Sequence, residues 1–271
     1  MNNIKIISID IDGTLLNDQH EVTSDVKVAI QTAMKQGIKI VITTGRPLSG
    51  VQPLLDELEI NGNQQYVVTH NGGLMQTADG HEILFASALT LTEWSEIHQF
   101  MQREKIYLQA EDQNQAHTTA KLVDPWASYE NYLVNLPLHV YEHDTDLRDV
   151  NLIKAIANAD AKELDRVQAI IPETIKSQVT VIRSTANNLE FVNKKTSKGN
   201  ALLALAQHLD VKIEQTMAIG DQANDATMIK AAGLGVAMGN AIPDIKQLAN
   251  VITEDNNHSG VAKAIKAYAL N

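Results

Sequence analysis

The chain contains no cysteine. This absence excludes disulfide bonds, zinc sites built from thiolates, and catalysis by a cysteine nucleophile. The sequence also has no run of about 18 apolar residues, so we expect no membrane-spanning helix. Residues 1–8 lack the basic stretch and following apolar stretch that mark a signal peptide, and we therefore expect a cytoplasmic protein.

Positive charge is scarce as well. The chain has 22 lysine and arginine residues against 33 aspartate and glutamate residues, a formal net charge of -11. Proteins that bind nucleic acid need a basic surface, so we expect no nucleic-acid partner. A small anionic substrate is compatible with this balance, because a bound cation and a few local donors can reverse the field at one site. The sequence leaves the oligomeric state open.

Strands and helices alternate near both ends of the 271-residue chain. The expected strands are residues 4–9, 38–43, 66–69, 216–219 and 235–238, and the expected helices are residues 22–36, 47–58, 198–209, 223–232, 243–248 and 262–269. Such alternation indicates a parallel sheet with right-handed crossovers and helices on both faces. We therefore predict an α/β fold with a Rossmann-like, three-layer, parallel-sheet core.

The middle of the chain differs from both ends. It holds most of the aromatic residues, and its signals for strands and helices are mixed. We predict a discontinuous catalytic core of residues 1–83 and 193–271, interrupted by an α+β cap domain of residues 84–192. Within this insertion, the polar run 111–119 indicates either a hairpin that faces the cleft or a solvated surface.

Acidic, small and hydroxyl-bearing residues follow the predicted strands of the core. Asp10 and Asp12 come directly after the first strand. The corresponding residues after later strands are Thr43, Thr44, Gly45 and Arg46, then His70, Asn71, Gly72 and Gly73, and finally Gly220, Asp221, Asn224 and Asp225. Because α/β sheets bind ligands at the carboxyl ends of their strands, we expect these residues to surround one site.

Asp10 and Asp12 stand two residues apart. In an extended chain such residues point to the same side, so their carboxylates repel each other unless a cation lies between them or one is protonated. Oxygen ligands suit a hard cation such as Mg²⁺, and Asp221 supplies a third carboxylate from another strand end. Taken alone, Asp10 and Asp12 have an alternative explanation as turn-forming or helix-capping residues.

Four segments occur in the order of the motifs of a known family. They are Asp10-Ile11-Asp12-Gly13-Thr14, Thr43-Thr44-Gly45-Arg46, Ser197-Lys198-Gly199 and Gly220-Asp221-Gln222-Ala223-Asn224-Asp225. This set resembles the four motifs of the haloacid dehalogenase superfamily of phosphohydrolases, and the insertion resembles its C2 type of cap. Residues 70–73 and 235–241 resemble further marks of the Cof-type branch, which includes sugar-phosphate phosphatases.

The resemblance implies a role for each motif residue. Asp10 would attack phosphorus and form an aspartyl-phosphate, which a carboxylate can do at neutral pH because it is already ionised. Asp12 would protonate the leaving oxygen and then deprotonate the water that cleaves the intermediate. Lys198, Thr44 and Gly45 would hold the phosphate and stabilise the charge on the transferring group.

The resemblance also implies a metal site. Mg²⁺ would bind Asp10, Asp221 and the backbone carbonyl oxygen of Asp12, and it would screen the attack of one anion on another. We expect Asn224 to reach the phosphate. We expect Asp225 to support the metal side of the site.

Three further residues complete the expected site. Arg46 either contacts the substrate or pairs with an acid, and Asn71 shapes a turn near the reacting groups. Glu190, just before the chain returns to the core, is expected to contact the substrate. The cap would close over the leaving group, exclude water and set specificity through its contacts.

The leading hypothesis is therefore a phosphatase of small phosphorylated metabolites, with sugar phosphates as the expected class. A phosphomutase, which returns the phosphate to a sugar, would use the same nucleophile. A receiver-like signalling module also holds an aspartyl-phosphate with clustered acids, a hydroxyl residue and a lysine. The large insertion and the second acid at Asp12 argue against the receiver-like alternative.

Overall fold

A computed structural model describes residues 3–270 of the protein, so the outermost residues of the predicted core lie outside it. Contacts divide the chain into two compact units. Unit 1 comprises the residues up to Gly45, Gln52–Phe85 and the residues from Ser197 on, and unit 2 comprises Arg46–Val51 and Ala86–Thr196. The assignment of these parts to a catalytic core and a specificity cap stays a prediction.

The sheet of unit 1 has eight strands in the order β14-β13-β12-β1-β2-β3-β4-β5. They are β1 (Ile6–Ile9), β2 (Lys39–Thr43), β3 (Tyr66–Thr69), β4 (Leu74–Thr77), β5 (Ile83–Ala86), β12 (Thr216–Gly220), β13 (Leu234–Ala237) and β14 (Val251–Ile252). The pairs from β14 to β3 are parallel, which confirms the predicted fold class. The sequence did not predict β14, β5 or β4, which runs antiparallel to β3.

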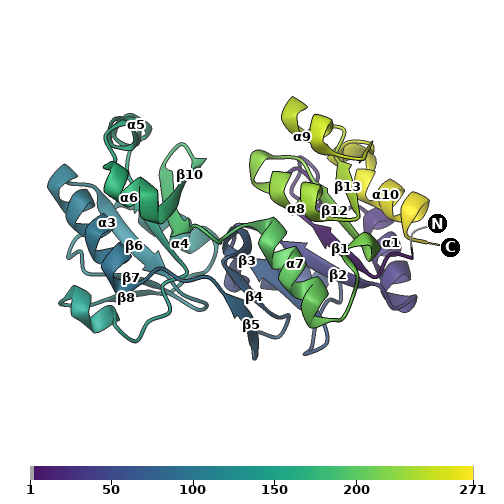
Figure 1. Ribbon diagram of the computed structural model, residues 1–271, viewed down its shortest axis with the longest axis horizontal. Helices are drawn as coiled ribbons and strands as arrows, with labels where there is room; N and C mark the ends of the chain where they lie inside the picture. Colours follow the sequence, from purple (N-terminus) through teal and green to yellow (C-terminus); the bar gives the residue numbers. More distant parts are fainter. Residues whose placement is uncertain (1–2, 271) are drawn as a thin grey trace. The chain divides into compact units, whose positions relative to one another are not determined.

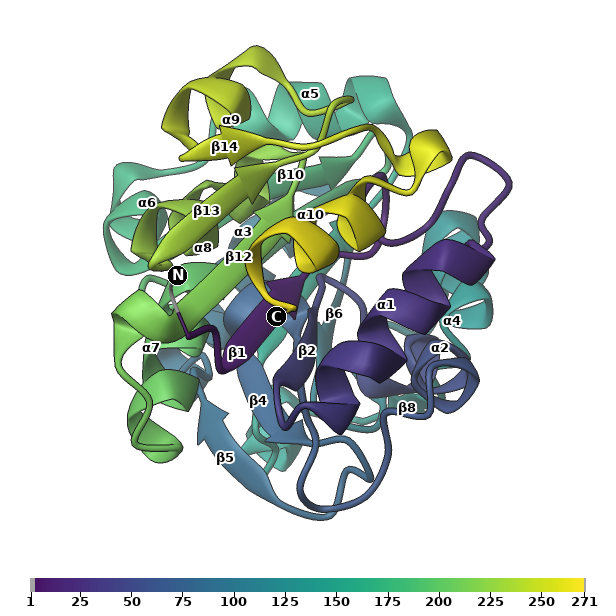
Figure 2. The same cartoon turned by 90° about the vertical axis from the view of Figure 1, so that its right-hand side faces the viewer.

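Helices cover both faces of this sheet. They are α1 (Ser24–Lys35), α2 (Gln52–Glu57), α7 (Lys198–His208), α8 (Ala226–Ala231), α9 (Pro243–Leu248) and α10 (Gly260–Tyr268). Helices α1 and α10 pack together on one face, whereas α7 and α8 pack together on the other (Figures 1 and 2). Ile6 packs with residues of α7 and α8, and the alternation of a strand directs Ile7 to the opposite face. Burial on both faces explains why these strands are apolar runs.

Two predicted helices are wrong in detail. Residues 47–58 form a 3₁₀ turn, η1 (Leu48–Gly50), followed by the short α2, and Pro47 lies outside the turn in an extended conformation. A side chain at Gly50 would crowd Val134, since a Cβ there would lie 3.0 Å from the Cβ of Val134. The N-terminal turn of the predicted helix 223–232 is likewise a 3₁₀ turn, η5 (Ala223–Asp225), that precedes α8.

Unit 2 contains a six-stranded mixed sheet in the order β10-β11-β9-β6-β7-β8. Its strands are β6 (Tyr107–Glu111), β7 (Ala116–Thr118), β8 (Leu138–Val140), β9 (Lys154–Asn158), β10 (Val179–Thr185) and β11 (Asn188–Asn193). Its helices are α3 (Leu91–Glu104), α4 (Pro125–Leu133), α5 (Ala161–Ala169) and α6 (Glu173–Gln178). Strands β6 and β7 pair antiparallel across residues 112–115, so residues 111–119 include a hairpin, and its orientation toward a cleft stays a prediction.

The two faces of the unit 2 sheet differ in chemistry. One face is apolar and packs with residues of α3, α5 and α6, with Phe191 among the largest buried side chains. The other face carries buried polar side chains on the adjacent strands β11, β9 and β6: Gln109, Glu111, Lys154, Asn158, Asn188 and Glu190. A domain core of this size ordinarily needs no charged residues, so this polar face calls for an explanation.

No helix in the described range 3–270 combines the length and apolar character needed to cross a membrane. The expected cytoplasmic location stays a prediction.

Helix α7 allows a test of the packing of unit 1. Leu205 is fully buried in the core between α7 and the sheet, whereas Leu203 in the same helix is 45% exposed. We expect Leu205→Ala to lower the free energy of unfolding by about 2–5 kcal/mol, because it leaves a cavity. The matched change Leu203→Ala should cost less than about 1 kcal/mol. Urea unfolding followed by circular dichroism measures both, and equal losses would contradict the described packing.

Candidate active site

The segment after β1 brings Asp10 to the carboxyl end of the sheet. The amide of Asp10 donates a hydrogen bond to the carbonyl of Ile219 (3.1 Å), which fixes the segment beside β12. The chain then turns at Gly13, whose φ is +79°. A Cβ at Gly13 would lie 2.6 Å from Asp221 Oδ2, so only glycine allows this close approach. The hydroxyl of Thr14 donates to Asp221 Oδ1 (2.7 Å) and ties the turn to the next strand end.

Lys198 lies at the centre of the buried charges. The side chain of Ser197 accepts a hydrogen bond from the amide of Asn200 (3.0 Å), and this cap starts α7 at Lys198. The ammonium of Lys198, which is fully buried, lies 2.5 Å from Asp10 Oδ1 and 2.6 Å from Asp225 Oδ1. One cation therefore holds two acids that come from different strand ends.

Asp225 organises the turn after β12. Its Oδ1 accepts from Lys198, and its Oδ2 accepts from the backbone amides of Asp221 (2.9 Å) and Gln222 (3.0 Å). A side chain at Gly220 would collide with this carboxylate, since a Cβ there would lie 2.5 Å from its Cγ. Both oxygens of Asp225 are thus engaged by the protein, which favours a positioning role over metal ligation.

Three buried carboxylates share one small volume. Ligand oxygens of Asp10, Asp221 and Asp225 lie within 4.8 Å of one another. Burial raises the pKa of Asp10 to about 7 although Lys198 lowers it, and burial also raises the pKa of Asp221. Three acids face one lysine, so the fully ionised site carries more negative charge than Lys198 neutralises. An oxygen-only set of donors with excess negative charge fits a hard divalent cation, with Asp10 and Asp221 as the available carboxylate ligands.

A second group of predicted residues meets around Asn71, which adopts a left-handed conformation (φ 57°) in the turn after β3. The Asn71 amide donates to the carbonyl of Thr44 (2.9 Å), and its side-chain oxygen accepts from Asn224 Nδ2 (3.1 Å). A Cβ at Gly45 would lie 3.0 Å from Asn71 Nδ2. Asn71 thus links the ends of β2 and β12, and Thr44 and Gly45 lie beside it.

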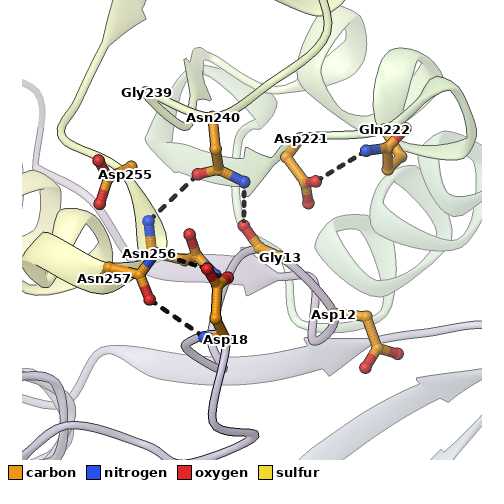
Figure 3. A pocket seen from close by; sticks show the side chains of 10 residues that line it. All are labelled: Asp12, Gly13, Asp18, Asp221, Gln222, Gly239, Asn240, Asp255, Asn256 and Asn257. Carbon is orange, nitrogen blue, oxygen red and sulfur yellow. Dashed lines mark hydrogen bonds between the residues drawn. The ribbon is translucent and has the colours of Figure 1, made fainter.

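The exposed Asp12 lines a cavity of about 550 Å³ in unit 1 (Figure 3). The cavity is lined by Asp12, Gly13, Asp18, Asp221, Gln222, Gly239, Asn240, Asp255, Asn256 and Asn257. Sequence reasoning did not foresee Asn240 or Asn256 here, although Asn240 lies in the segment 235–241 that it singled out. The predicted residues Arg46 and Glu190 belong to unit 2.

Glu190 is part of a buried ion cluster on the polar face of the unit 2 sheet. Lys154 Nζ lies 3.2 Å from Glu111 Oε2 and 3.4 Å from Glu190 Oε1. Burial lowers the pKa of Lys154, but the two glutamates raise it more, so its pKa is above the ordinary value and the lysine stays charged. The second oxygen of Glu190, Oε2, is buried and has no hydrogen-bond partner among residues 3–270. Glu111 is the first residue of the polar run 111–119, whereas no sequence pattern pointed to Lys154.

A family model described as haloacid dehalogenase-like hydrolase matches residues 7–265. The protein YxeH of Bacillus subtilis is 38% identical over 98% of each chain. The 5-amino-6-(5-phospho-D-ribitylamino)uracil phosphatase YcsE of B. subtilis is 32% identical over 98% of this chain and 96% of its own. A solved haloacid dehalogenase-like hydrolase from Bacteroides thetaiotaomicron has a TM-score of 0.86 at 30% identity and covers 97% of this chain and 98% of its own.

The raised pKa of Asp10 predicts a pH dependence of stability in the metal-free protein. The native state binds this proton more tightly than the unfolded state, where the pKa is near 3.8. The stabilisation is therefore complete below the unfolded pKa and is lost as pH rises through about 7. Relative to Asp10→Asn, which cannot titrate, the wild type should lose up to about 3 kcal/mol between roughly pH 5 and 7.

This difference should level off above pH 7. Urea unfolding of both proteins in EDTA across this range measures it. Parallel stability curves for the two proteins would contradict the raised pKa.

Proposed function

The chain belongs to the haloacid dehalogenase-like hydrolases, as its four motifs predicted, and we propose that it is a Mg²⁺-dependent phosphatase of small phosphorylated metabolites. One observation carries the proposal: the buried Lys198 bridges Asp10 and Asp225 beside Asp221, at the carboxyl end of the sheet. The name of the relative YcsE, a phosphatase, supports the same reaction.

The first half of the proposed reaction forms a covalent intermediate. An oxygen of Asp10 attacks phosphorus, and the bond from phosphorus to the leaving oxygen breaks. Asp12 donates a proton to that oxygen, so the product leaves as a neutral alcohol. Exposure of Asp12 at the cavity is compatible with proton exchange, whereas the buried Asp10 is held for attack by Lys198.

The second half releases inorganic phosphate. Asp12, now ionised, takes a proton from a water molecule as that water attacks phosphorus, and the bond from phosphorus to Asp10 breaks. The charge on the transferring group would be stabilised by Lys198, by Thr44 and Gly45, and by Asn224. The contacts among Asn71, Thr44 and Asn224 support this arrangement, because they fix the two loops relative to each other.

The proposed metal ligands are the carboxylates of Asp10 and Asp221 and the backbone carbonyl oxygen of Asp12. Bound Mg²⁺ would supply positive charge that lowers the repulsion between the nucleophile and the phosphate. Asp225 would act through Lys198 and through the backbone of Asp221, since both of its oxygens are engaged.

The polar face of unit 2 supports a substrate with hydroxyl groups. The buried Glu190 Oε2 has no partner in the described chain, and a buried carboxylate oxygen without a donor is costly. Hydroxyl groups of a sugar or sugar-alcohol leaving group would supply that donor. The relative YcsE is named for a substrate with a phosphorylated ribityl chain, which belongs to this class. We propose Arg46 as a second substrate contact from unit 2.

A phosphomutase would share the nucleophile, and product analysis separates the two activities, since a phosphatase releases inorganic phosphate. A receiver-like module would form a long-lived phosphoryl adduct without turnover. Asp12 favours hydrolysis over that alternative, because it provides an acid and base beside the nucleophile.

Asp10→Asn should lower the rate of phosphate release from p-nitrophenyl phosphate by at least about 10³-fold, because it removes the nucleophile. Asp25→Asn, an exposed change in α1, serves as the matched control and should keep wild-type turnover. EDTA should abolish the wild-type activity, and added Mg²⁺ should restore it. Near wild-type turnover in Asp10→Asn would contradict the proposed mechanism.

Glu190→Gln should lower kcat/KM by about tenfold or more for sugar phosphates, because it removes a charged hydrogen-bond acceptor for hydroxyl groups. Its kcat/KM for p-nitrophenyl phosphate, whose leaving group has no further hydroxyl, should change less than about twofold. The exposed Glu163→Gln in the same unit is the control. An equal loss of kcat/KM on both substrates would show that Glu190 does not contact the leaving group.

A further inference from the structure

Asn240 connects the nucleophile loop, residues 10–14, to the last loop before α10. Its Nδ2 donates to the carbonyl oxygen of Gly13 (2.7 Å), and its Oδ1 accepts from the backbone amide of Asn256 (3.1 Å). Figure 3 shows both bonds at the edge of the cavity that Asp12 and Asp221 also line. The nitrogen of the Asn240 side-chain amide thus bonds the nucleophile loop, and its oxygen bonds the loop that contains Asn256.

The loop that bears Asn256 is itself held in place. Asn256, which is buried, donates through Nδ2 to the carbonyl of Leu16 (3.0 Å) and to Asp18 Oδ1 (3.1 Å). Gly239 lets the Asn240 segment approach closely, since a Cβ there would lie 2.7 Å from the amide nitrogen of Asp255. The segments around Asn240 and Asn256 are therefore held in place by contacts of their own.

Gly13 has no side chain to restrain its backbone. Glycine rotates freely about φ and ψ, and nothing in its own chemistry selects the observed φ of +79°. The peptide group before it carries the Asp12 carbonyl, and the peptide group after it carries the Gly13 carbonyl that Asn240 holds. Fixing the second group restricts the rotation of the first.

We propose that Asn240 is a positioning residue that orients the Asp12 carbonyl toward the cation. The inference rests on the proposed function, because that carbonyl is one of the proposed Mg²⁺ ligands. Residues 235–241 have no role in the proposed reaction steps, and positioning this carbonyl would be their role. Asn240 touches neither the phosphate nor the cation in this account and acts through Gly13.

The test measures cation binding without substrate, using Mn²⁺ as a paramagnetic probe and Mg²⁺ as its competitor. Asn240→Ala should weaken Mn²⁺ binding by about 10–100-fold, the usual loss when a residue behind a metal ligand is removed. Saturating Mg²⁺ should restore kcat to within about threefold of wild type, because the reacting groups are intact. A general structural defect would lower kcat at all metal concentrations.

Two further variants separate positioning from loosening of the loop. Asn240→Asp keeps the acceptor for Asn256 and loses the donor to Gly13, so it should also bind Mn²⁺ more weakly. Its added negative charge alone would strengthen cation binding, so weaker binding can arise only from lost positioning. Asn257→Ala removes contacts to Asp18 in the same loop without touching Gly13, and it should bind Mn²⁺ within about twofold of wild type.

Wild-type binding in both Asn240 variants would overturn this inference and leave the phosphatase proposal standing. An equal loss in Asn257→Ala would also overturn it, because general loop order would then be the cause. Absence of Mn²⁺ binding by the wild-type protein would overturn the proposed metal site together with the inference.

Discussion

The active-site end of unit 1 depends on the ion pairs that the buried Lys198 ammonium makes with Asp10 and Asp225. This ammonium lies between Asp10 and Asp225, and without it two carboxylates would face each other away from water. Asp225 accepts from Lys198 through one oxygen and from the backbone amides of Asp221 and Gln222 through the other, so the same carboxylate connects the lysine to the turn after β12. The ion cluster therefore joins α7, β1 and the turn after β12 into one rigid site.

Close backbone approach is the second constraint at this end of the sheet. At Gly13 and Gly220 the space that a Cβ would need is occupied by the carboxylates of Asp221 and Asp225. These glycines also leave the backbone free to rotate, so holding each turn in one conformation costs conformational entropy. Side-chain hydrogen bonds hold both turns: Thr14 and Asn240 bond around Gly13, and Asp225 bonds around Gly220.

Apolar runs and strand ends made the parallel core and its acidic cluster predictable, because both are local patterns on a regular sheet. The features that the sequence could not predict depend on contacts between residues far apart in the chain. In the 3₁₀ turn at residues 48–50, Ser49 donates a hydrogen bond to the carbonyl of Val134, 85 residues away, and the bond from Asn240 to Gly13 spans 227 residues. The strand β4 was missed because its four residues, Leu74–Thr77, show no apolar alternation that marks a strand. Asp225 was foreseen at the site, but its engagement by Lys198 required the folded turn.

Both units bury more acid than base. In unit 1, Lys198 faces three carboxylates, and in unit 2, Lys154 faces two glutamates. Apolar side chains of similar size would stabilise either position at least as well. The opposite face of the unit 2 sheet is filled in that way, with Phe191 beside Glu190 in sequence. The proposed ligands, a cation at Asp10 and Asp221 and hydroxyl groups at Glu190, would each compensate this buried negative charge. A ligand that binds only the folded protein stabilises it, so such sites would be less stable when empty than when occupied.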